Sequence, residues 1–112
     1  MTLECINPKD LPTPQTYTQV VVATGSKMVF VSGQEPEDII GKLVGPGDLA
    51  TQARQVFGNL GRALAAAGAR PAQVTRITIY VVNYNRDACL PIIEKARLTL
   101  FEIGRASCRE RV

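Results

Sequence analysis

The clearest pattern in the sequence is a helical stripe of apolar residues between positions 49 and 67. Its members recur three or four residues apart, which is the spacing of one face of an amphipathic helix: Ala53, Val56, Phe57, Leu60, Ala63, Leu64 and Ala67. Asp48 stands where an N-cap is favoured. Gly68 stands where a left-handed C-cap belongs, and Pro71 follows soon after. The pattern therefore predicts a helix with both of its ends defined.

A second apolar stripe predicts a second helix, from about Leu90 to Phe101. The apolar positions are Ile92, Ile93, Ala96, Leu100 and Phe101. Pro91 then falls in the first turn, where its missing N–H group does little harm.

Three segments have strand patterns. Tyr17–Ala23 and Lys27–Ser32 are rich in β-branched residues and flank the turn signal Thr24-Gly25-Ser26, which predicts an antiparallel hairpin. Val74–Val82 alternates between two faces, as a strand does. One face carries Thr75, Ile77, Ile79 and Val81, and the other carries Arg76, Thr78, Tyr80 and Val82. Residues 5–16 hold three prolines and predict an extended arm.

The expected order of elements is therefore β-β-α-β-α. Two amphipathic helices need a sheet face to cover, so the order predicts an α+β sandwich with both helices on one face of a mixed sheet. Such a sheet needs at least one more strand after the second helix.

The last ten residues break the pattern. Residues 103–112 are rich in arginine and show no apolar periodicity. A DNA sequence resembling a widely used short-read sequencing adapter translates to these same ten residues. We therefore expect a single domain over residues 1–102 and a non-native tail over residues 103–112. The alternative interpretation is a basic tail that binds an anionic partner.

Composition and charge exclude several functions. The chain has 13 Lys and Arg against 10 Asp and Glu, but without residues 103–112 the balance is 10 against 9. This nearly neutral domain gives no argument for nucleic acid as a partner. No apolar run is long enough to span a membrane, and the N-terminus does not resemble a signal peptide, so no membrane partner is expected.

The chain contains no histidine, which excludes Ser-His and Cys-His nucleophile pairs and histidine metal ligands. Its three cysteines are far apart and form no CxxC pair, so no zinc ribbon, iron–sulfur site or thioredoxin-like redox pair is expected. They are expected to be free thiols, as in the reducing cytoplasm.

Few residues suggest chemistry by type alone. Gly45-Pro46-Gly47-Asp48 is either an anion site at a helix N-terminus or a capped turn. Glu35, Glu37 and Asp38 form either an acid/base cluster or a solvated loop. Tyr17 and Ser32 stand at strand ends, where site residues are often found.

The ordered set of segments resembles the Rid family, the reactive intermediate deaminases once labelled L-PSP endoribonucleases. The similarity covers about residues 6–101. The matching stretches are Tyr17–Val21, Val29–Gln34, Gly41–Asp48, Gln52–Leu60, Ala66–Gly68 and Val74 with Thr78–Val82.

The resemblance implies a chorismate-mutase-like subunit in a homotrimer, with ligand pockets at the subunit interfaces. It implies hydrolysis of reactive enamine or imine metabolites to 2-keto acids and ammonia, without a cofactor or metal. Tyr17 and Ser32 match positions that line the pocket and are the expected substrate-binding residues.

The family's catalytic arginine and glutamate should follow Phe101, where the suspected tail begins, so the catalytic residues stay unassigned. Arg105 is not taken as the missing arginine. Two functions therefore remain open: a cofactor-free enamine/imine hydrolase, and a non-catalytic trimeric protein that binds a small metabolite. The hydrolase requires an arginine at the missing position, whereas the binding protein predicts a neutral or apolar residue there.

Overall fold

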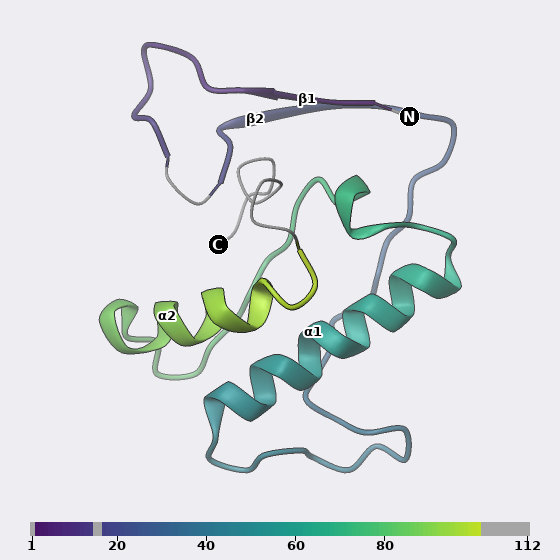
Figure 1. Cartoon of the computed structure of the whole chain (residues 1–112), viewed down its shortest axis with the longest axis vertical. Coiled ribbons are helices and arrows are strands. Elements are labelled where there is room, and N and C mark those ends of the chain that lie inside the picture. The colour runs from purple at the N-terminus through teal and green to yellow at the C-terminus, as the bar shows by residue number, and fades with distance from the viewer. Residues whose placement is uncertain (1, 15–16, 102–112) are drawn as a thin grey trace.

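The computed structural model describes residues 2–14 and 17–101. Its elements are β1 (Thr2–Ile6), β2 (Val20–Thr24), α1 (Leu49–Ala66), the short 3-10 helix η1 (Pro71–Gln73) and α2 (Arg86–Arg97). Figure 1 shows the two strands as a ribbon at one end of the molecule and the two helices side by side at the other. Residues 103–112, the predicted non-native tail, lie outside the described residues.

The predicted hairpin is wrong in its pairing. β2 pairs antiparallel with β1, with Ile6 opposite Val20 and Thr2 opposite Thr24, rather than with Lys27–Ser32. The intervening loop is closed by its own contacts: Asn7 Oδ1 accepts from the Gln19 backbone N–H at 2.9 Å, and the Gln19 amide donates to the Pro12 carbonyl at 2.9 Å. A turn signal shows where the chain bends but does not choose a strand's partner. The first residues of the predicted arm therefore belong to a strand.

The first predicted helix is confirmed with both of its ends. Asp48 is the N-cap of α1, and its carboxylate accepts from the Thr51 backbone N–H at 3.2 Å. Gly68 has a φ of +71°, the left-handed conformation that glycine adopts without strain. The buried positions of α1, Ala53, Phe57 and Leu64, all belong to the predicted stripe.

The second helix exists, but its predicted start is wrong. α2 begins at Arg86 because Asn85 caps it, with Asn85 Oδ1 accepting from the Ala88 backbone N–H at 3.2 Å. Pro91 therefore lies inside the helix and not in its first turn. Asparagine is among the best N-cap residues, and this local signal outweighs the proline. The helix ends at Arg97, earlier than predicted, and a turn carries the chain on to Phe101.

Neither Lys27–Ser32 nor Val74–Val82 is a strand in the described part of the chain. Both run as extended segments behind the two helices in Figure 1. The alternation predicted for the second segment is nevertheless present. Ile77, Ile79 and Val81 pack against the core, and Tyr80 and Val82 on the opposite side are exposed. A strand needs backbone partners, whereas the alternation needs only an apolar layer on one side.

The core lies between the two helices and the inward face of segment 74–82. Phe57 of α1 and Phe101 meet edge to face, with ring centroids 6.4 Å apart. Ala53 of α1 and Ile93 and Ala96 of α2 complete the buried cluster. At Gly61 α1 comes close to the turn that follows α2, because an added Cβ would lie only 3.1 Å from Leu100 Cδ1. The predicted α+β class is confirmed, with two helices and a small antiparallel sheet.

Candidate functional site

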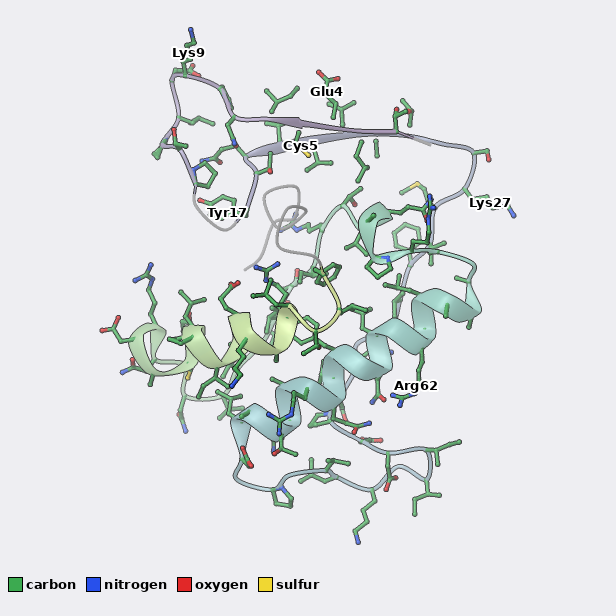
Figure 2. The ribbon with its side chains drawn as sticks, in the orientation of Figure 1. Glu4, Cys5, Lys9, Tyr17, Lys27 and Arg62 are labelled. Atoms are coloured by element: carbon green, nitrogen blue, oxygen red, sulfur yellow. The ribbon has the colours of Figure 1, made fainter. Side chains whose placement is uncertain are left out.

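The two residues predicted to bind substrate lie on different segments. Tyr17 is half-buried at the bend that leads into β2, as Figure 2 shows, and it precedes the fully buried Thr18. Ser32 is exposed at the end of the extended segment 27–32, and its carbonyl accepts from the Gln34 amide at 3.0 Å. The described contacts do not join Tyr17 to Ser32, so their shared role stays a prediction.

The acidic segment is an ordered loop. Asp38 Oδ1 accepts from the backbone N–H groups of Ile40 and Lys42 at 3.0 and 2.9 Å, which makes Asp38 a turn residue. A hydrogen bond with Glu35 raises the pKa of Glu37 above its ordinary 4.5, and the charges of Glu35 and Asp38 raise it further. The carboxylates thus affect one another, and Asp38 and the backbone of Glu35 and Glu37 are used in the hydrogen bonds that shape and anchor the loop. The geometry favours the structural interpretation over an acid/base cluster.

Two amides of α1 hold this loop against the helix. Asn59 Nδ2 donates to the Glu37 carbonyl at 2.8 Å and to the Glu35 carbonyl at 3.2 Å. Gln55 Nε2 donates to the Glu37 carbonyl at 3.1 Å and to Asn59 Oδ1 at 3.0 Å. The polar face of α1 therefore anchors the loop through its backbone.

A shallow hollow of about 220 Å³ lies beside this anchor. Its lining residues are Val44, Thr51, Arg54, Gln55, Gly58 and Arg62. Arg62 Nη1 donates to Asn59 Oδ1 at 3.2 Å, and Arg54 Nη2 approaches Thr51 Oγ1 at 3.4 Å. Sequence reasoning missed both arginines. The available signal was their spacing, since residues 54, 58 and 62 lie on one side of a helix with glycine in the middle.

The Gly45–Asp48 segment is a capped turn and not an anion site. The Asp48 carboxylate itself occupies the N-terminus of α1. It accepts hydrogen bonds from the Thr51 hydroxyl at 2.7 Å and from the Thr51 backbone N–H at 3.2 Å. The hydroxyl bond is the largest cause that lowers the pKa of Asp48 below its ordinary 3.8. A second negative group would therefore meet a carboxylate already in place.

Among the cysteines that the structure describes, the expectation of a free thiol is confirmed for Cys89, which is half-buried on α2, and is wrong for Cys5. Cys5 on β1 is disulfide-bonded. Cysteine pairing depends on which thiols the fold brings together, and spacing along the chain does not reveal it. A disulfide-bonded cysteine does not indicate a reducing compartment, and the cytoplasmic location stays a prediction.

Within residues 2–14 and 17–101, the acidic and sulfur side chains form no group that could hold a metal ion. None of the described helices is long and apolar enough to cross a membrane.

A family model described as endoribonuclease L-PSP matches residues 8–98. The chain belongs to this family, which is the Rid family. The sequence resemblance is thereby confirmed over most of the described residues.

Two relatives support the assignment. Protein DfrA of Myxococcus xanthus is 39% identical over 67 residues, which is 60% of this chain and 51% of the relative. This match thus spans about half the length of the Myxococcus protein. A RutC family protein of Synechocystis is 31% identical over 97 residues, covering 83% of this chain and 72% of the relative.

Two solved structures share the fold. The Rid family protein YyfB of Yersinia pestis, described as of unknown function, superposes with a TM-score of 0.83 and 29% identity, covering 100% of this chain and 86% of its own. A probable translation initiation inhibitor from Rhodopseudomonas palustris has a TM-score of 0.64 and 26% identity, covering 98% and 83%. The described part of the chain therefore has the Rid fold.

Proposed function

We propose that this Rid protein hydrolyses reactive enamine or imine metabolites in a pocket that contains Tyr17 and Ser32. Water adds to the imine carbon and the C–N bond breaks, which releases a 2-keto acid and ammonia. The observation that carries the proposal is the family match over residues 8–98, which includes both residues. A half-buried phenol and an exposed hydroxyl are suited to hold a small polar substrate by hydrogen bonds.

We propose further that the pocket is completed by neighbouring subunits of a homotrimer. Four large apolar side chains point away from the core and are almost fully exposed: Met28 at 82%, Phe30 at 83%, Tyr80 at 93% and Val82 at 88%. They lie on the two extended segments that run behind the helices in Figure 1. Exposed apolar surface of this kind marks an association site. Self-association of the Rid fold would cover it.

The test is 2-keto acid release from 2-aminoacrylate generated in the assay. We expect Tyr17→Phe and Ser32→Ala each to lower kcat/KM about tenfold, the effect of one lost substrate hydrogen bond. Tyr84→Phe removes a phenolic hydroxyl group just before α2 and should leave kcat/KM unchanged. An assembled trimer that releases no keto acid would overturn the enzyme proposal and leave the metabolite-binding protein as the function.

A further inference from the structure

The hollow on α1 contains a guanidinium that is held in place and open to a ligand. The exposed side chain of Arg62 is oriented by one hydrogen bond from its Nη1 to Asn59 Oδ1 at 3.2 Å, and Asn59 itself donates to the carbonyls of Glu35 and Glu37. An arginine supported in this way loses little conformational freedom when a ligand binds. Its remaining N–H groups are arranged as a fork that matches a carboxylate or a phosphate.

Gly58 keeps the space beside this guanidinium open. A Cβ added at Gly58 would lie 3.4 Å from Arg62 Nη1, so a longer side chain there would extend into the hollow. The volume of about 220 Å³ holds about seven water molecules at about 30 Å³ each. That is room for an oxyanion group and a few further atoms.

The local charges leave Arg62 available. Among the described residues, neither Arg54 nor Arg62 forms an ion pair with a carboxylate. Arg54 helps to lower the pKa of Asp48, although as the smallest cause, so part of its charge acts on the helix cap. The described contact of Arg62 is to the neutral amide oxygen of Asn59 and not to a carboxylate of the acidic loop.

We propose that this hollow binds the oxyanion group of a small metabolite, with Arg62 as the pairing cation and Gly58 as the opening beside it. Arg54 lies eight residues away, about 12 Å along the helix axis, and adds positive potential at the other end. Val44 supplies an apolar wall for the rest of the ligand. The proposal concerns the outer face of α1 and does not depend on the deaminase activity at Tyr17 and Ser32.

The test is a titration of the 112-residue chain with inorganic phosphate and, separately, with acetate at low ionic strength, followed by NMR at the amide of Gln55, a lining residue that every variant keeps. We expect a saturable shift. Arg62→Gln should weaken binding about tenfold, which corresponds to one lost charge-assisted hydrogen bond. Gly58→Leu should abolish the shift while circular dichroism shows α1 retained, since leucine favours a helix more than glycine does.

Arg86→Gln is the matched control, because it removes the same charge from the exposed start of α2, outside the hollow. Binding should change by less than about twofold in this variant. Tighter phosphate than acetate binding would assign a phosphate-bearing metabolite, and the reverse would assign a carboxylate. A shift that does not saturate, or equal weakening in Arg62→Gln and Arg86→Gln, would overturn the proposal.

Discussion

Arg97 is the one charged side chain among the described residues that is almost wholly buried. It lies at the end of α2 with 4% of its side chain exposed, and its Nη2 pairs with Glu94 Oε2 at 2.5 Å. Its Nη1 has no hydrogen-bond partner among the described residues. The pair therefore compensates a buried charge only in part, and the two partners should differ in their effect on stability.

We expect Glu94→Gln to lower the free energy of unfolding by about 3 kcal/mol, because it leaves the buried guanidinium without its counter-charge. Arg97→Met should cost far less, since it removes the charge and keeps an apolar stem of similar length. Urea denaturation followed by circular dichroism measures both variants. Equal losses would mean that Arg97 acts through packing and not through its charge.

The cap at Asp48 predicts a pH dependence with a defined sign. Hydrogen bonds from Thr51 hold the pKa of Asp48 below its ordinary 3.8 in the folded chain. The carboxylate therefore stabilises α1 fully above pH 3.8, and this contribution is lost as the pH falls through the lower folded-state value. In Asp48→Asn the cap is kept but does not titrate. The melting temperature of this variant should fall less steeply than that of the wild type between pH 4 and pH 2.

At the scale of elements, the loop over residues 35–44 should depend mainly on the Asn59 side chain, which bonds two of its carbonyls, whereas Gln55 bonds only that of Glu37. Asn59→Asp keeps the shape of the side chain but removes the donors to the carbonyls of Glu35 and Glu37 and brings a negative charge to them. We expect hydrogen exchange at the Val44 amide, which bonds to the Pro36 carbonyl at 2.7 Å, to quicken at least about tenfold.

Gln52→Glu is the control for this loop, because it makes the same chemical change on α1 at a residue whose side chain has no described bond to the loop. Exchange at Val44 should stay within about twofold of the wild-type rate. Equal acceleration in both variants would show that added negative charge on α1, and not the Asn59 anchor, controls the loop.

The elements also show which parts of this fold are predictable from the sequence. α1 was predicted with its ends because the stripe, Asp48 and Gly68 are all local signals. The partner of β2 was not predicted from the sequence, because the pairing with β1 is decided by contacts across the loop of residues 7–19. Arg62 was not predicted as a site residue, because an arginine on the polar face of a helix is usually solvated. Its hydrogen bond to Asn59 is visible only in the structure.

At the scale of the whole molecule, the exposed apolar face predicts that a single glutamate introduced into it disrupts the trimer. Phe30 and Tyr80 are among its most exposed side chains, at 83% and 93%. Phe30→Glu or Tyr80→Glu would place an unpaired charge in the proposed subunit interface. We expect the trimer to dissociate, with at least about a hundredfold loss of affinity, because a buried charge without a partner adds to the lost apolar contact.

Ile39→Glu is the control for assembly, since Ile39 is fully exposed on the acidic loop and not on this face. Analytical ultracentrifugation across a range of concentrations should find this variant as a trimer and the Phe30 and Tyr80 variants as monomers. The core packs on the opposite side, against Ile77, Ile79 and Val81, so the monomers should keep their helical signal. Trimers that persist with glutamate at position 30 or 80 would place the interface on another surface, and the pocket at Tyr17 and Ser32 would then need a different neighbour.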